Sequence, residues 1–149
     1  MKKIVILILA LFLVGCSKEE MITCNIEVNN KLQNYTLEGT YNIYYKDNYV
    51  THIKKKEQYI STNEEFISYL NESKNLEYYN LNDLYGGYTY DIKSGESSVF
   101  ITSKIDLSIL DLKKMEKDNK IDKNYIVGNR LTKSGIIRVY ESKGAVCDI

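Results

Sequence analysis

A strict two-residue alternation between apolar and polar side chains is the feature that most limits the fold of this 149-residue chain. It is clearest in residues 35–45, where Tyr35, Leu37, Gly39, Tyr41, Ile43 and Tyr45 alternate with Thr36, Glu38, Thr40 and Asn42. Side chains of a β-strand point to opposite faces in turn. The pattern therefore predicts a long strand with one buried face and one solvated face.

The segments on either side of this strand predict its partners. Residues 22–28 alternate with Cys24, Ile26 and Val28 on one face. Residues 46–48 (Lys-Asp-Asn) are typical of a turn, and residues 49–60 return as a third strand rich in β-branched and aromatic residues. Together the three segments predict an antiparallel meander.

A change of period after residue 60 predicts a helix. Ser61 and Thr62 precede Glu64 and Glu65 in the pattern of a capping box. We expect this helix to continue to about residue 84 and to end at Gly86 and Gly87. Its expected apolar face consists of Phe66, Tyr69, Leu70, Leu76 and Leu84.

The remaining elements are shorter. Residues 88–105 alternate around a glycine-containing turn and predict a hairpin, after which Asp106 or Ser108 can cap a short helix that buries Leu112 and Met115. A third helix should begin near Thr132 and stop at Gly144, and residues 145–148 should form a last short strand. The expected class is α+β: a sheet made of the three-stranded meander, a hairpin and a short C-terminal strand, packed by about three helices.

The N-terminus has the layout of an export signal. Lys2 and Lys3 precede an apolar run at residues 4–14, which is too short to span a bilayer as a helix. The sequence Leu13-Val14-Gly15-Cys16 resembles the lipobox of bacterial lipoproteins. This resemblance implies a signal peptide at residues 1–15 and a lipid on Cys16, which anchors the protein to the extracytoplasmic face of the cell membrane. Residues 16–21 are then a polar tether, and residues 22–149 a single domain.

The other two cysteines lie at opposite ends of that domain. Cys24 and Cys147 are both on short apolar, strand-like segments, and an exported compartment permits disulfides. If the last strand lies beside the first, the two cysteines meet and form a disulfide. Two buried free thiols or a redox-active pair are the alternatives, although the sequence lacks the CxxC spacing typical of redox sites.

Several of these motifs also occur together in a known family. The lipobox, the tyrosine-rich meander and four short motifs resemble the YehR-like family of small bacterial lipoproteins. The short motifs are Thr23-Cys24, Tyr85-Gly86-Gly87-Tyr88-Thr89-Tyr90, Ile105-Asp106-Leu107 and Gly144-Ala145-Val146-Cys147. The resemblance implies an α+β domain with an antiparallel sheet, and it implies no biochemical activity.

Candidate catalytic groups are few. His52 is the only histidine, which removes multi-histidine metal sites and leaves one candidate base. Asp106 with Asp111, or Glu64 with Glu65, could act as paired carboxylates on glycosides. Helix capping and the helix dipole explain the same carboxylates. We therefore expect no catalytic residues, no cofactor and no metal.

A binding surface is the remaining hypothesis. Lys54, Lys55 and Lys56 form a basic run that could contact anionic lipid or wall polymer, or could instead protect a sheet edge. Tyr85 and Tyr88 add aromatic side chains with polar tips, which suit wet binding surfaces.

Charge balance narrows the partners of such a surface. The chain has 20 Lys and Arg against 20 Asp and Glu, so no net basic field points to nucleic acid. We expect a non-catalytic binding or assembly module that contacts an envelope protein or wall polymer. The alternative is an enzyme, or an enzyme accessory, acting on cell-wall polymer.

Overall fold

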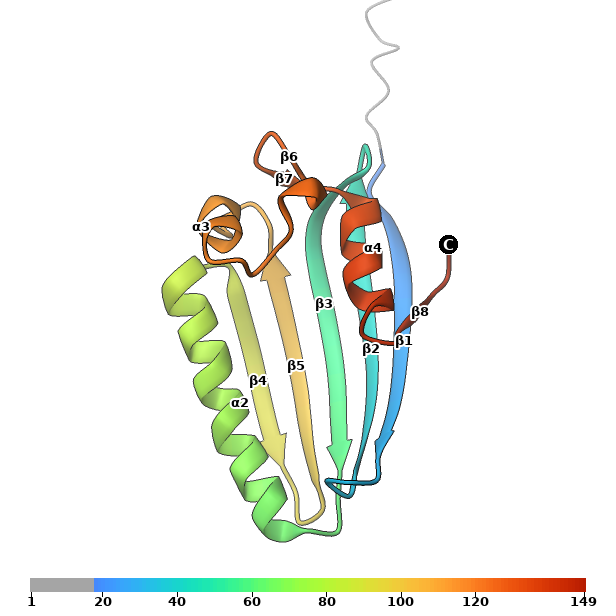
Figure 1. Cartoon of the computed structure of the whole chain (residues 1–149), viewed down its shortest axis with the longest axis vertical. Coiled ribbons are helices and arrows are strands. Elements are labelled where there is room, and N and C mark those ends of the chain that lie inside the picture. The colour runs from blue at the N-terminus through green and yellow to red at the C-terminus, as the bar shows by residue number, and fades with distance from the viewer. Residues whose placement is uncertain (1–17) are drawn as a thin grey trace, which may run out of the picture.

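A computed structural model describes residues 18–149 as a six-stranded antiparallel sheet with helices on one face (Figure 1). The strand order is β4-β5-β3-β2-β1-β8. The long strands are β1 (Glu20–Asn30), β2 (Tyr35–Lys46), β3 (Tyr49–Ile60), β4 (Tyr88–Ser94) and β5 (Ser98–Asp106). The helices are α2 (Glu64–Tyr85), α3 (Leu112–Lys117) and α4 (Lys133–Glu141), with a short 3-10 helix η2 (Lys123–Tyr125). The expected α+β class, meander and hairpin are confirmed.

The first strand begins earlier than expected. Strand β1 starts at Glu20, which pairs with Tyr45 of β2, so the last two residues of the expected tether belong to the sheet. The hydroxyl of Tyr45 donates a hydrogen bond to the Glu20 carboxylate at 3.0 Å. The expected signal peptide and Cys16 lie outside the described residues.

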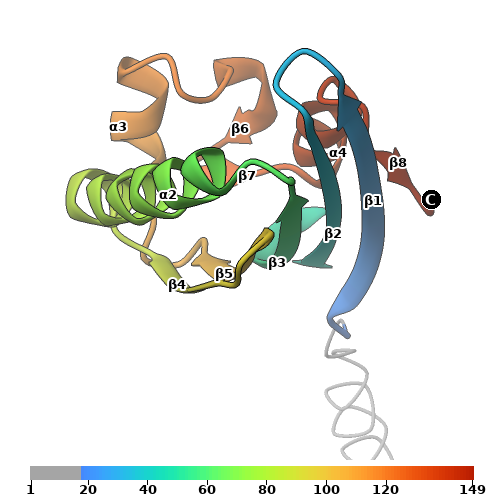
Figure 2. The same ribbon diagram turned by 90° about the horizontal axis from the view of Figure 1, so that it is seen from below.

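The helices cover one face of the sheet and leave the other face open (Figure 2). Alternate residues of the strands form a buried layer beneath the helices, in which Ile43, Ile53 and Ile101 of the three neighbouring strands are almost fully buried. We call this helix-covered side the inner face. No helix of residues 18–149 packs on the opposite side, which we call the open face.

Helix α2 differs from the expectation in its cap and its buried face. Asn63, rather than Ser61 or Thr62, is the N-cap, and its side chain accepts a hydrogen bond from the Phe66 amide at 3.1 Å. The buried residues are Ile67, Leu70, Tyr78 and Tyr85, whereas Tyr69, Leu76 and Leu84 of the expected apolar face are exposed. The helix ends as predicted, because Gly86 and Gly87 both adopt positive φ.

The segment after the sheet also departs from the prediction at one cap. Helix α3 begins after Asp111, whose carboxylate accepts from the Lys114 amide at 3.0 Å. Asp106 instead stabilises the preceding turn by accepting from the Ser108 amide at 3.1 Å. A small hairpin of β6 (Ile126–Val127) and β7 (Arg130–Leu131) was not predicted, although Gly128 and Asn129 at its turn are typical turn residues.

Helix α4 begins where the sequence predicts. Thr132 is its N-cap and accepts a hydrogen bond from the Gly135 amide at 3.2 Å. Gly135 lies so close to η2 that an added Cβ would be 2.5 Å from Cβ of Tyr125. Only a residue without a side chain fits at this point, which brings α4 against η2.

The C-terminus returns to the first strand and forms the predicted disulfide. Strand β8 (Val146–Cys147) pairs antiparallel with β1, and Cys24 lies directly opposite Cys147. The two Cα atoms are 3.9 Å apart, and the disulfide joins residues 123 positions apart in the sequence. The disulfide is therefore confirmed over the alternative of two free thiols.

Candidate functional site

The residues of the expected binding surface do not form one surface. Lys54 and Lys56 lie on the open face, whereas the Lys55 side chain lies on the inner face and keeps only 18% exposure. Tyr85, the last residue of α2, and Tyr88, the first residue of β4, are both buried. Adjacent strand residues point to opposite faces, so the basic run is necessarily divided. The edge-protection alternative is wrong as well, because β3 lies between β2 and β5.

On the open face, three lysines surround a shallow depression. Lys54 is paired in register with Lys104 of β5, and Lys56 with Thr102. The depression has a volume of about 380 Å³ and is also lined by Thr89 and Asp91 of β4. Lys56 has no hydrogen-bond or ion-pair partner among residues 18–149, while Lys54 lies 5.1 Å from the centre of the Tyr44 ring. We call Lys54, Lys56 and Lys104 the lysine cluster.

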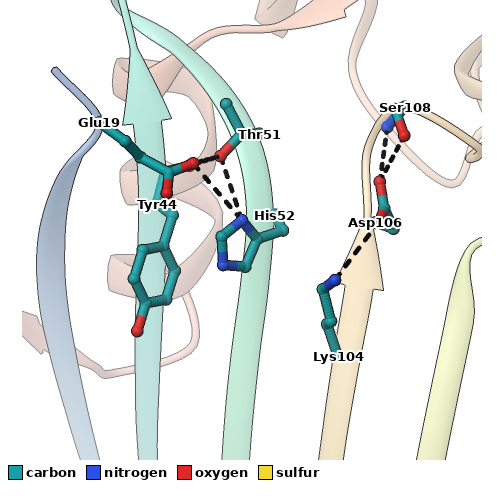
Figure 3. A network of polar contacts seen from close by, with 7 residues as sticks. All are labelled: Glu19, Tyr44, Thr51, His52, Lys104, Asp106 and Ser108. Atoms are coloured by element: carbon teal, nitrogen blue, oxygen red, sulfur yellow. Dashed lines mark hydrogen bonds and ion pairs between the residues drawn. The ribbon is translucent and has the colours of Figure 1, made fainter.

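His52 lies beside this cluster in a polar network (Figure 3). Its ring stacks on that of Tyr44, with 4.1 Å between centroids. Its Nδ1 is 3.2 Å from the Thr51 hydroxyl oxygen and 3.6 Å from the Glu19 carboxylate. Glu19 also accepts a hydrogen bond from Thr51, so the residue just before β1 is held against β3.

The environment of His52 favours its neutral form. Burial lowers the pKa of His52 below its ordinary value of 6.5, and the charges of Lys104 and Lys54 act in the same direction. The carboxylates of Glu19 and Asp106 oppose this effect without overcoming it. A neutral imidazole stacked on a tyrosine is a packing arrangement, and it leaves the positive charge of this face to the lysines.

Asp106 is paired in register with His52, at the same end of the cluster, and lies beside Lys104 (Figure 3). Its carboxylate accepts from the Ser108 hydroxyl at 2.6 Å and is 3.4 Å from the Lys104 amine. The hydrogen bonds from Ser108, together with Lys104, lower the pKa of Asp106. Asp106 is therefore an ionised turn residue, and its proposed partner Asp111 is a helix cap. Glu64 and Glu65 occupy the first turn of α2, where a helix favours negative charge.

The inner face holds a second group of polar residues. The Lys55 amine donates to the Tyr78 hydroxyl at 3.2 Å and lies 3.5 Å from the Glu57 carboxylate, which accepts from the Tyr41 hydroxyl at 2.9 Å. Burial acts to lower the pKa of Lys55, but Glu57 and Tyr78 more than offset it, so the pKa lies above its usual range. Lys55 is therefore a charged amine inside the domain.

A cavity adjoins this buried amine. It has a volume of about 210 Å³ and lies between the inner face and the three helices. Lys55 and Tyr88 line it from the sheet, and Tyr78 and Tyr140 from α2 and α4. Lys55 and Tyr88 were expected at a binding surface, and Leu112 and Met115 were expected only as buried residues of a short helix. Their meeting around one cavity was not predicted, because the lining residues come from segments far apart in the chain.

The described residues also bear on metal and membrane hypotheses. Within residues 18–149, no group of three or more His, Cys, Asp and Glu side chains is placed to hold a metal ion. Over the same range, every helix is too short or too polar to cross a membrane.

Two solved structures are similar to this one. The NMR structure of Escherichia coli YehR has 18% sequence identity, covers 89% of this chain and 92% of its own, and superposes with a TM-score of 0.55. The NMR structure of a protein from Streptococcus pneumoniae TIGR4 has 14% identity, covers 91% of this chain and 88% of its own, and gives a TM-score of 0.53. At these identities the similarity extends to the fold alone. No family model and no curated protein matches the sequence.

Proposed function

We propose that this protein is an exported lipoprotein, held through Cys16 at the extracytoplasmic face of the cell membrane, and that it acts there as a non-catalytic binding module for an anionic wall polymer. The observation that carries the binding role is the lysine cluster on the open face. The anchoring rests on the lipobox at residues 13–16.

The geometry of the cluster suits a polyanion. Lys54, Lys56 and Lys104 present amines from two neighbouring strands around one depression, and Thr89 and Thr102 add hydroxyl groups beside them. Lysine binds phosphate as a flexible point charge, so it tolerates an irregular or repeating ligand. A shallow, open surface also accommodates a chain that passes across it, which an enclosed pocket does not.

Polymer binding can be measured by sedimenting the purified protein with insoluble cell walls. Reversing two charges in Lys54→Glu/Lys56→Glu should reduce the bound fraction by about tenfold, because two attractive contacts become repulsive. The matched control is Lys113→Glu/Lys117→Glu, which makes the same charge change on exposed positions of α3. Wall material stripped of its phosphate should bind the wild-type protein weakly.

Four results would contradict the polymer proposal. If both double variants lose the same fraction of wall binding, binding depends on net charge alone and not on the lysine cluster. If the wild-type protein binds walls stripped of phosphate as well as it binds intact walls, phosphate is not the ligand. Release of soluble wall fragments by the wild-type protein would favour the alternative of an enzyme or enzyme accessory. An envelope protein crosslinked at Lys54, with no wall bound, would replace the polymer as the partner.

The anchor has its own test. Cells grown with a labelled fatty acid should incorporate the label into the wild-type protein and not into Cys16→Ala, because only the Cys16 thiol can form the thioether that attaches diacylglycerol. Equal labelling of the two proteins would refute the anchor and leave the polymer proposal unaffected.

A further inference from the structure

The cavity on the inner face is lined mainly by aliphatic side chains, and the rest of the lining consists of tyrosines and charged residues. Helix α2 contributes Leu81, α3 contributes Leu112 and Met115, the following loop contributes Ile121, and α4 contributes Ile136 and Val139. At about 30 Å³ for a group the size of a water molecule, its volume of 210 Å³ holds about seven methylene groups. The aliphatic part of this space favours an apolar group, because water finds few polar partners there, whereas the amines and tyrosine hydroxyls of the lining favour a polar group.

The charged groups that line the cavity are mostly cationic. Lys55 lies on the sheet side, and Lys120, Lys143 and Glu77 lie at the rim. Glu57 beside Lys55 offsets the charge of that lysine, so the excess of positive charge comes from Lys120 and Lys143 at the rim, which outnumber Glu77. Partial burial and the charge of Lys55 lower the pKa of Lys143, so an incoming anion would relieve an unfavourable environment.

Lys55 has bonding capacity left for a ligand. An ammonium group has three N–H donors. Among residues 18–149, two oxygen atoms contact it, the Tyr78 hydroxyl and a Glu57 carboxylate oxygen. The Lys55 side chain lines the cavity, so the third donor is available to an oxygen that enters there.

From these observations we propose that the cavity binds an anionic amphiphile: a single aliphatic chain between α2, α3 and α4, with its carboxylate or phosphate head held by the lysines. This site lies on the opposite face of the sheet from the lysine cluster and does not depend on polymer binding. A free fatty acid and a phospholipid share the required chemistry, and the experiment distinguishes them.

The test is photocrosslinking of the full chain in living bacteria. Cells are given a ten-carbon fatty acid that bears a photoreactive diazirine and an alkyne, then irradiated, and the purified protein is digested and analysed by mass spectrometry. We expect adducts on peptides from α2, α3 and α4 that line the cavity. The mass of each adduct identifies either the free acid or a phospholipid that has incorporated it.

Two variants test whether the cavity is the site. Val139→Trp fills the cavity from a half-buried position of α4 and should reduce the adducts by about tenfold. Leu76→Trp places the same indole on an exposed position of α2 outside the cavity and should leave them unchanged. A cooperative thermal unfolding transition of each purified variant shows that it has folded.

A third variant tests the lysines. Lys120→Ala/Lys143→Ala should reduce the adducts by about fivefold, since two exposed charge contacts are lost. Lys113→Ala/Lys117→Ala, two exposed lysines of α3 that do not line the cavity, is the matched control.

Several results would overturn the proposal. They are an absence of adducts on the cavity peptides, adducts that survive Val139→Trp in folded protein, or equal losses in the two double lysine variants. Label on the Cys16 peptide is read separately, because it reports the anchor. Loss of that label alone refutes the anchor, and loss of the cavity adducts alone refutes this site.

Discussion

Removing the Cys24–Cys147 disulfide should destabilise the domain strongly. The bridge closes a loop with a sequence separation of 123 residues. In the chain-entropy model, a loop of that length restrains the unfolded chain by about 16 cal/mol/K, or about 5 kcal/mol at room temperature. Engineered and native bridges often contribute less, so we expect a loss of about 3 to 5 kcal/mol.

The expected change in melting temperature follows from the size of the domain. At about 2.1 cal/mol/K per residue, the described domain has an unfolding entropy near 0.28 kcal/mol/K. The loss then corresponds to a decrease of about 10 to 18 °C. Strand β8 has only two residues and lies at the sheet edge, so few other contacts hold it to β1.

The assay compares melting curves of a chain beginning at Lys18, the first described residue, with those of Cys24→Ala/Cys147→Ser. Alanine is used at position 24 because that side chain is fully buried and a serine hydroxyl there would add its own cost. Reduced wild-type protein should melt close to the double variant, and reductant should not change the variant. A melting temperature within about 2 °C of the oxidised wild type would refute the loop argument.

Three smaller predictions concern other elements. Gly135→Ala should destabilise by about 1 to 3 kcal/mol, because its methyl group overlaps a neighbouring segment, whereas Gly95→Ala should change the unfolding free energy little. Asn63→Ala should cost about 1 kcal/mol by removing the cap of α2, whereas Asn80→Ala, on an exposed position of the same helix, should be neutral or stabilising. The lowered pKa of His52 means that this side chain binds a proton more readily in the unfolded chain than in the folded one. The free energy of unfolding therefore keeps the full contribution of neutral His52 above pH 6.5 and decreases as the pH falls below that value. His52→Gln should flatten this part of the pH dependence.

Denaturant titrations measure all three effects. Equal stability of the Gly135 and Gly95 variants would show that the close approach of α4 to η2 is not real. If Asn63→Ala leaves the free energy of unfolding unchanged, Asn63 is not the N-cap of α2, and Ser61 or Thr62 is again the candidate. The histidine argument fails if the difference in stability between wild type and His52→Gln is the same at pH 7.5 and pH 5.

The strands could be predicted because their signal is local. Alternation of side chains is a property of each strand alone, and β3 has the bounds expected from residues 49–60. The buried face of α2 could not be predicted in this way. Tyrosine and leucine occur all around this helix, so spacing alone does not show that Tyr78 is buried and Tyr79 exposed. The sheet beneath the helix decides which side is covered.

The candidate sites were only partly accessible to sequence reasoning, for the same reason. Strand alternation could have placed Lys55 opposite Lys54 and Lys56. The same alternation could have placed Glu57, two residues along the strand, beside Lys55. The other partner of the buried charge, Tyr78 on α2, is supplied only by tertiary structure. Lys104 joins Lys54 and Lys56 only through the pairing of β3 with β5, which requires a crossover through α2 and β4.

The early start of β1 limits how far the domain can extend from the membrane to which we propose it is attached. Cys16 is four residues from Glu20, and an extended chain spans at most about 3.6 Å per residue. The near end of the sheet would thus stay within about 14 Å of the lipid-bearing sulfur. A strand of 11 residues adds about 37 Å, so with this anchor the far end of β1 would lie no more than about 50 Å from the lipid-bearing sulfur. The lysine cluster would then reach only the part of the wall nearest the membrane. Inserting residues before Glu19 would increase the depth of wall that the cluster can reach.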